Sequence, residues 1–272
     1  MVRRKDYKEN ITHKGMKRRG KKAQVAIFVI VAIAIVALIV LGVIFYPRLS
    51  GVFYGELNPS SYLRDCIEPE VKIGKELLSK QGGYQDPEGF AFYGGEKIKY
   101  LCYTDDYYET CVVQQPMIKN HFELELNGMI KNRAGECTRN LINEYEKRGY
   151  DVSSAEIDSS VVIIPGKINV IVESPMSVTK DTTQTFKRFN IEIESEMYDL
   201  LFTAGSIIDY ESSLGDSASE LYLQYYPDLK IEKTKLSDGT KIYKLSNVVT
   251  EESFVFASRS LAWPAGYGLE EL

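Results

Sequence analysis

Residues 23–45 read AQVAIFVIVAIAIVALIVLGVIF, and Gln24 is the only polar side chain in this stretch. At about 1.5 Å of rise per residue, a helix of this length measures about 34 Å, which is enough to cross a hydrocarbon layer of about 30 Å. The sequence therefore predicts a transmembrane helix over 23–46. Its apolar core is longer than the roughly 7 to 15 residues of a secretory signal, and it runs into Tyr46-Pro47-Arg48 rather than a small-x-small cleavage site. We expect a retained signal anchor.

Charges are distributed unevenly around this helix. Residues 1–22 hold ten Lys and Arg against Asp6 and Glu9, so this tail carries +8, whereas the whole 272-residue chain carries −5. The positive-inside rule retains such a basic flank in the cytoplasm. We therefore expect a single-pass protein of the cell membrane, with a cytoplasmic tail that contacts anionic lipid rather than nucleic acid. Residues 47–272, the body, are expected to be extracytoplasmic.

All four cysteines, Cys66, Cys102, Cys111 and Cys137, belong to the body. An even number of cysteines in an exterior space predicts disulfides, and three pairings are possible. We favour Cys102–Cys111, which closes a short loop. Cys66 and Cys137 both fall on the apolar stripes of expected helices, so their pairing would join those helices. No Cys-x-x-Cys pair occurs, and His121 is the only histidine after the span, so no zinc site is expected.

Hydrophobic spacing predicts an α+β fold with two domains in the body. The first domain, 47–150, is expected to be α-rich and to contain the disulfides. It begins with a helix capped by Ser60 or Ser61 and interrupted at Pro69, which either kinks this helix or lies in the first turn of a second one. A β-hairpin and two further apolar helical stripes follow. The hairpin turns at Gly94-Gly95, and the stripes are Ile118, Phe122, Leu126 and Ile130, then Cys137, Leu141 and Tyr145.

The second domain, 151–272, is expected to combine an antiparallel sheet with helices. Alternating apolar residues over 151–193 predict three or four strands with one solvated face. Apolar positions at helical spacing then predict a helix that ends near Gly215. The remaining expected elements are a short helix stopped by Pro227, two strands around Asp238-Gly239 and a buried strand over 254–257.

The loop between the second and third cysteines is the strongest candidate for a partner contact. It carries Tyr103, Tyr107 and Tyr108, and tyrosine supplies contact area at a low entropic cost. Alternatively, these rings pack on the helices and the loop's acidic residues are only solvated. Arg259 and Trp263 are further contact candidates. Their alternatives are an ion pair with an acid of the same domain for Arg259 and coverage of a sheet edge or the core for Trp263.

Patterns for catalysis or metal binding are weak. The acids Asp105, Asp106 and Glu109 offer oxygen ligands for Ca²⁺, but their spacing does not match an EF-hand. The run from Ser177 to Lys180 has the S-x-x-K spacing of Ser/Lys hydrolases, but its β pattern does not place both side chains on one helix face. The sequence contains no G-x-S-x-G, H-E-x-x-H, Walker or G-x-G-x-x-G motif. We expect no catalytic residues, no metal and no cofactor.

The segment Arg18-Arg19-Gly20, directly before the apolar helix, resembles the class III signal of archaeal pilin-like proteins. In that family a peptidase cuts after a glycine that follows basic residues. Lys21 and Lys22 would then begin the mature chain. Val25 occupies the fifth mature position, where such pilins often carry glutamate. The resemblance implies a pilin-like filament subunit as an alternative function.

Further motifs run through the body: Gln81-Gly82-Gly83-Tyr84, Leu101-Cys102-Tyr103-Thr104, Cys111, Cys137 and Arg259-Ser260-Leu261-Ala262-Trp263-Pro264. Together they resemble a family of uncharacterised archaeal single-span surface proteins. This resemblance implies a location and an architecture, but no activity. We expect a structural or interaction protein of the cell envelope that contacts an envelope or surface protein, or a second copy of itself as a homo-oligomer. The alternatives are the pilin-like subunit and a membrane-tethered Ser/Lys hydrolase.

Overall fold

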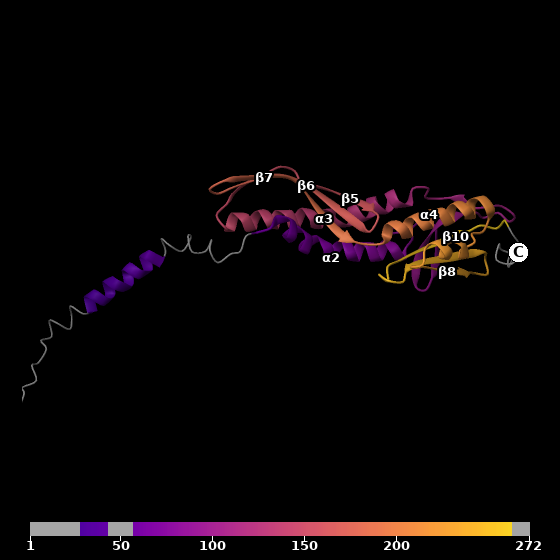
Figure 1. The fold of residues 1–272 in the computed structure, drawn as a ribbon, viewed down its shortest axis with the longest axis horizontal. Coiled ribbons are helices and arrows are strands. Elements are labelled where there is room, and N and C mark those ends of the chain that lie inside the picture. Colours follow the sequence, from indigo (N-terminus) through magenta and orange to yellow (C-terminus); the bar gives the residue numbers. More distant parts are fainter. Residues whose placement is uncertain (1–27, 43–56, 263–272) are drawn as a thin grey trace, which may run out of the picture. The chain divides into compact units, whose positions relative to one another are not determined.

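A computed structural model describes residues 28–42 and 57–262 of the chain (Figure 1). These residues belong to two compact units, Met1–Gly55 and Glu56–Leu272. The described part of the first unit is a helix over 28–42 with exposed side chains. The tail and both ends of the predicted membrane span lie outside the described residues. Within the described residues, the structure contains no helix that is both long enough and apolar enough to cross a bilayer.

The second unit confirms the α+β class, with two mainly antiparallel sheets and two disulfides. Its helices and strands follow one another in the chain as α2 (Pro59–Lys80), β1 (Phe90–Tyr93), β2 (Glu96–Tyr103), β3 (Val112–Val113), α3 (Ile118–Lys147), β4 (Asp151–Ser154), β5 (Asp158–Ile164), β6 (Lys167–Thr179), β7 (Thr183–Glu194), α4 (Met197–Leu214), α5 (Glu220–Tyr225), β8 (Leu229–Lys235), β9 (Thr240–Asn247) and β10 (Ser253–Arg259).

Helix α2 begins and continues differently from the sequence prediction. The side chain of Asn58 accepts hydrogen bonds from the backbone N–H groups of Ser60 and Ser61, so Asn58 rather than either serine is the cap. Pro69 lies inside α2 without interrupting it. Its side chain is exposed, and the buried stripe Leu63, Ile67 and Val71 continues on both sides of it. Packing of this stripe therefore outweighs the backbone hydrogen bond that proline removes.

The two predicted stripes of α3 belong to one continuous helix, which packs against α2. Cys66 and Cys137 form a disulfide between the two helices, with their Cα atoms 5.9 Å apart, which confirms that predicted pair. The helices approach closely at Gly74, where an added Cβ would lie 2.9 Å from Leu126 Cδ1. Glycine at this position therefore permits the packing.

A four-stranded antiparallel sheet covers this helix pair, as predicted for 151–193. β6 is central and pairs with β7 along one edge, while β5 and β4 share its other edge. Alternate residues of β6 are buried, so one face packs on the helices and the other is solvated. The side chain of Glu123 on α3 accepts a hydrogen bond of 2.7 Å from the Ile163 N–H of β5, which ties the sheet to the helix.

The second sheet joins segments that are far apart in the sequence. Its strands lie in the order β1-β2-β10-β9-β8, and β3 pairs with β2. The β10–β2 pair is parallel, with Ser258 opposite Cys102. The main hydrophobic core takes residues from both sides of position 150, including Phe122 and Phe254, whose ring centroids are 6.3 Å apart. The predicted domain division at 150/151 thus falls inside one compact unit.

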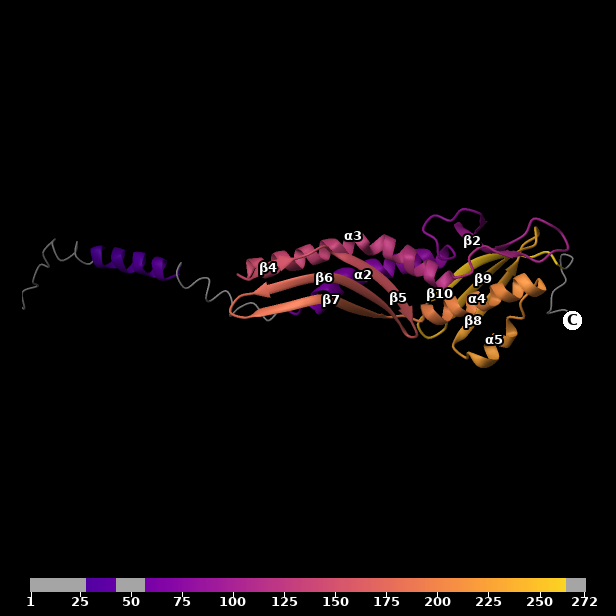
Figure 2. The ribbon, with the colours of Figure 1, turned by 90° about the horizontal axis from the view of Figure 1, so that it is seen from above.

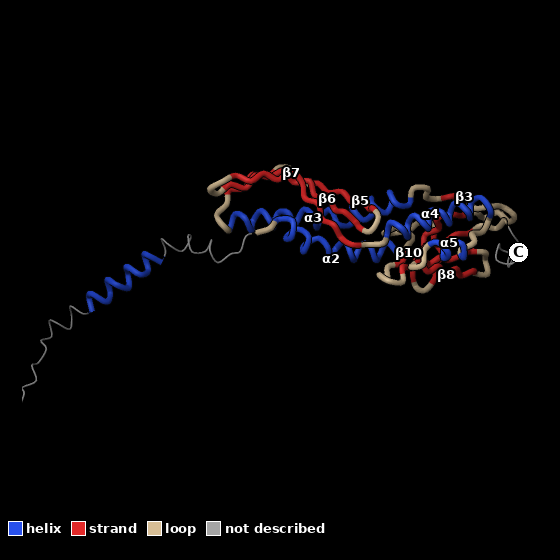
Figure 3. Tube along the Cα trace, in the orientation of Figure 1, coloured by secondary structure: helices blue, strands red, loops and turns tan. Residues whose placement is uncertain are grey.

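Within this unit, the two sheets follow one another along the α2–α3 pair (Figures 1 and 2). Figure 3 shows the long helices in blue beside the four-stranded sheet, with the second sheet at the far end of α2. Arg64, near the start of α2, donates a hydrogen bond to the Glu192 carbonyl of β7. Cys102 belongs to β2 of the second sheet, so the loop between Cys102 and Cys111 lies at the end of the unit away from the four-stranded sheet.

Candidate functional site

The predicted disulfide between Cys102 and Cys111 is present, with the two Cα atoms 5.3 Å apart. Both cysteines are buried, and Cys102 belongs to β2 in the middle of the second sheet. The bond closes residues 103–110 into a loop, called here the tyrosine loop. Its two ends are therefore fixed on the sheet.

The backbone of the tyrosine loop is also held by the residues that end and follow β10. The Thr104 N–H donates to the Arg259 carbonyl at 3.0 Å, and the Tyr108 N–H donates to the Leu261 carbonyl at 2.8 Å. The Leu261 N–H in turn donates to the Glu109 carbonyl at 3.0 Å. The loop is thus fixed at several points along its length.

The three tyrosines of the loop have different environments. The Tyr103 hydroxyl donates to Asp105 at 2.7 Å, and the Tyr103 ring centroid lies 4.9 Å from that of Tyr100. Tyr103 is therefore part of the loop's internal packing, and the hydrogen bond to Asp105 raises its pKa. Tyr107 and Tyr108 instead keep 73% and 77% of their surface exposed. Both rings face solvent on the tyrosine loop.

The backbone of Tyr108 has an uncommon conformation. Its φ angle is 67°, in the left-handed region that favours glycine. For a residue with a side chain, this conformation costs about 1 to 2 kcal/mol. Glycine would fit here without that cost.

Arg259 fixes the loop rather than projecting from it. Its guanidinium donates to the Thr104 carbonyl at 2.5 Å and the Asp238 carbonyl at 3.0 Å, and it pairs with Asp105 at 3.4 Å. The Arg259 side chain is only 12% exposed. Arg259 therefore forms an ion pair within the body, but its partner Asp105 belongs to the predicted domain 47–150 and not to the predicted domain of Arg259, 151–272. Trp263 lies outside the described residues.

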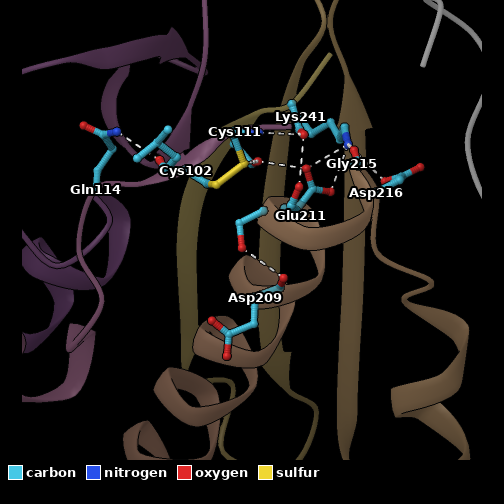
Figure 4. The surroundings of a disulfide bond; sticks show 12 residues. Cys102, Cys111, Gln114, Asp209, Glu211, Gly215, Asp216 and Lys241 are labelled. Atoms are coloured by element: carbon cyan, nitrogen blue, oxygen red, sulfur yellow. Dashed lines mark hydrogen bonds and ion pairs between the residues drawn. A yellow bond between two sulfur atoms is a disulfide. The ribbon is translucent and has the colours of Figure 1, made fainter. Parts of the chain in front are cut away.

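A buried ionic network lies beside the disulfide (Figure 4). Both carboxylate oxygens of Glu211 accept hydrogen bonds from Lys241 Nζ, at 2.9 and 2.8 Å. The same carboxylate accepts from the Tyr243 hydroxyl at 2.5 Å and the Ser258 hydroxyl at 2.9 Å. Lys241 Nζ also lies 3.1 Å from Asp216 Oδ1. Glu211 is fully buried, so its negative charge is balanced by neighbours rather than by water.

The electrostatics of the two carboxyl groups differ. Burial raises the pKa of Glu211 above its usual range, although Lys241 and Tyr243 oppose that shift. Burial would also raise the pKa of Asp216, but the charges of Lys241 and Lys233 outweigh it and lower this pKa to about 2. Asp216 is therefore a charged partner of both lysines at neutral pH.

This network connects α4 to the tyrosine loop. The Ser260 hydroxyl donates to the Glu211 carbonyl at 3.0 Å, and the Ser260 hydroxyl oxygen accepts a hydrogen bond from the Cys111 N–H at 3.1 Å. The sequence analysis did not single out Glu211. A signal was present, because Glu211 follows the buried position Ile208 by three residues and so places an acid on the apolar face of α4. A buried acid of this kind predicts a buried cationic partner.

The weaker sequence motifs do not assemble into a site. Ser177 lies in β6 opposite Thr185, whereas Lys180 Nζ donates to the Arg148 carbonyl at 2.9 Å and lies over the Tyr150 ring. No hydrogen bond joins Ser177 to Lys180 in the described part of the chain. Across residues 28–42 and 57–262, no three His, Cys, Asp or Glu side chains are arranged to hold a metal ion.

Comparison with protein-family models, curated proteins and solved structures finds no match to this chain. The interpretation of the site therefore depends on its own geometry. That geometry consists of a closed loop, backbone hydrogen bonds that fix it and two exposed rings at its tip. Such an arrangement suits binding, because the loop is ordered before a partner arrives.

Proposed function

We propose that this chain is a membrane-anchored extracytoplasmic protein of the cell envelope whose body binds a protein partner through the tyrosine loop. One observation carries the proposal: Tyr107 and Tyr108 are exposed on a loop that is already held by a disulfide and by backbone hydrogen bonds. Exposed aromatic residues on a fixed loop bind partners with little loss of conformational entropy.

The membrane location and orientation rest on the sequence. The apolar run over 23–45 is long enough to span a bilayer, and the basic tail before it favours a cytoplasmic amino terminus. The two disulfides of the body support an extracytoplasmic location, because disulfides persist in oxidising or exterior spaces. The three features are mutually consistent.

The charge of the loop indicates the chemistry of the partner. Asp105 is paired with Arg259, whereas Asp106 and Glu109 are exposed beside the two tyrosines. A matching surface would combine apolar or aromatic residues with Lys or Arg, which pair with carboxylates and stack on tyrosine rings. We propose a protein partner of this composition in the envelope, or a second copy of this chain.

Co-purification tests the proposal. The full chain is extracted with detergent from native membranes, beside a Tyr107→Ser/Tyr108→Ser variant and a Leu124→Ser variant. Leu124 is the matched control because it is an apolar residue 72% exposed on α3. The wild type and the control should retain a defined partner or a second copy, and the loop variant should lose it. A strictly monomeric wild type without a captured partner would contradict the proposal.

The amino terminus of the same purified chain can be determined by mass spectrometry. An intact tail agrees with the anchored protein that we propose. A mature chain beginning at Lys21 would instead support the pilin-like alternative implied by Arg18-Arg19-Gly20.

A further inference from the structure

A second candidate site lies between α4 and α5 and shares no residue with the tyrosine loop. It is a cavity of about 560 Å³, open to solvent on one side. Pockets of roughly 300 to 1,000 Å³ are typical of small-molecule sites. The cavity is therefore large enough for a small ligand.

Tyrosine dominates the walls of this cavity. Tyr210 comes from α4, and Tyr222, Tyr225 and Tyr226 come from α5 and its carboxyl end. Leu214 and Leu221 complete the apolar part of the wall. Four phenol rings around one cavity offer several ring faces to a bound molecule. None of the residues that line the cavity carries a formal charge.

One of these rings is fixed by hydrogen bonding. The Tyr222 hydroxyl and the Ser206 hydroxyl are 2.8 Å apart, which holds the Tyr222 ring against α4. Burial raises the pKa of Tyr222, and the nearby charge of Asp209 adds to the rise. Tyr222 is therefore a neutral phenol at physiological pH.

The electrostatic surroundings favour a cation. No Lys, Arg or His occurs in residues 189–229, the stretch that contains every residue lining the cavity. Asp209 and Glu220 flank the tyrosines in this stretch, and the described residues give neither of them an ion-pair partner. Lys233 of the neighbouring strand β8 is occupied, since it pairs with Asp216 and donates to the Ser217 carbonyl.

We propose that this cavity binds a small organic cation through cation–π contacts with its tyrosine rings. The faces of aromatic rings carry partial negative charge and attract alkylated ammonium groups. An alkylated ammonium ion needs few hydrogen-bond acceptors, which suits a wall of phenol rings and leucines. An anionic ligand is disfavoured, because no basic side chain lines the cavity and acidic residues flank it.

Choline is a suitable probe because 3,3-dimethylbutanol is its neutral isostere. The full chain is purified in a maltoside detergent, which supplies no ammonium group, and binding is measured by calorimetry. We expect saturable binding of choline and about tenfold weaker binding of the neutral isostere. Equal affinities for the two probes, or no saturable choline binding at millimolar concentration, would overturn the proposal.

Variants at Tyr225 distinguish the ring from mere apolar surface. Tyr225 is exposed, so its replacement leaves the core intact. Tyr225→Leu should weaken choline binding about tenfold, whereas Tyr225→Phe should retain it, because the ring face remains. Tyr93→Leu, a change of an exposed tyrosine on β1 outside the cavity, is the matched control and should bind as the wild type does. A Tyr225→Leu variant that binds choline as tightly as this control would refute the assignment.

Discussion

The two ends of the body are stabilised by different interactions. Around Cys66–Cys137, α2 and α3 pack mainly through buried aliphatic and aromatic side chains under the four-stranded sheet. Around Cys102–Cys111, a buried carboxylate, a lysine and several hydroxyl groups lie under the tyrosine loop. Both ends share the main hydrophobic core, and the end around Cys102–Cys111 adds a buried polar network to it; we call them the apolar end and the polar end.

The two ends are therefore suited to different roles. Apolar packing is non-directional, so it holds α2, α3 and the sheet together without specifying the position of each polar atom. Hydrogen-bonded charges require a defined geometry, and a partly satisfied network is costly. The polar end thus holds the tyrosine loop in one conformation, whereas the apolar end serves as a scaffold.

Lys241→Met is the change expected to have the largest effect on stability. It leaves Glu211 buried without its cationic partner, so we expect the free energy of unfolding to fall by about 3 to 5 kcal/mol. Urea unfolding of residues 47–272 measures this. Lys97→Met is the control, because it breaks a surface ion pair with Asp86 and should cost at most about 1 kcal/mol. Similar losses in both variants would remove the distinction between the two ends.

The two disulfides should differ in their contribution. The bonded cysteines are 71 residues apart in one disulfide and 9 in the other. Loop-closure entropy then predicts a loss of about 4 kcal/mol for Cys66→Ala/Cys137→Ala and about 3 kcal/mol for Cys102→Ala/Cys111→Ala. Urea unfolding ranks the two variants. A larger loss of stability for Cys102→Ala/Cys111→Ala than for Cys66→Ala/Cys137→Ala would contradict this ranking. It would mean that the Cys102–Cys111 bond stabilises the polar end by more than loop-closure entropy accounts for.

Acid should weaken the polar end through Asp216. Its pKa is about 2 in the folded state against a reference value of 3.8, so the unfolded chain binds a proton more readily. The stability that Asp216 contributes is therefore fully present above the reference pKa and is lost as the pH falls towards 2. From about pH 5 to pH 2, the wild type should lose about 2 kcal/mol more than Asp216→Asn.

Urea unfolding at a series of pH values measures this difference. Asp86→Asn, at the surface pair with Lys97, is the control and should follow the wild-type profile. Parallel profiles for the wild type and Asp216→Asn would show that Asp216 does not stabilise the polar end.

Tyr108→Gly should have the smallest effect on stability. Unlike the changes above, it should stabilise the fold. Removing a side chain from a left-handed backbone position should raise the free energy of unfolding by up to about 1 kcal/mol. Partner binding should nevertheless weaken. Glu251→Gly is the matched control, because Glu251 has a φ angle of 61° in the turn between β9 and β10. It should gain similar stability and keep partner binding. Unchanged binding by Tyr108→Gly would argue against a contact role for this ring.

Much of the local structure could be predicted from the sequence. The stripe from Ile118 to Ile130 predicted the start of α3, and Gly94-Gly95 predicted the first hairpin. Both cysteine pairs could also be predicted. Cys66 and Cys137 lie on the apolar stripes of two helices, and Cys102 and Cys111 close a short loop. Each of these features depends on short-range spacing, which a single sequence displays directly.

Features that depend on tertiary contacts could not be predicted. The parallel pairing of β10 with β2 joins residues more than 150 positions apart, and nothing in either strand's spacing specifies its partner. Pro69 looked like a break because the packing that keeps α2 continuous comes from other elements. For the site, the exposure of Tyr107 and Tyr108 and the fixing role of Arg259 became clear only from the fold.

Site-specific photocrosslinking in native membranes tests the central claim most directly. A photoreactive residue replaces Tyr107 in one full-length variant and Leu124 in another, two positions of nearly equal exposure on the loop and on α3. The account predicts a discrete crosslinked protein, or a second copy of the chain, from position 107 and none from position 124. Equal capture at both positions, or capture at position 124 alone, would contradict the claim that the tyrosine loop is the contact surface.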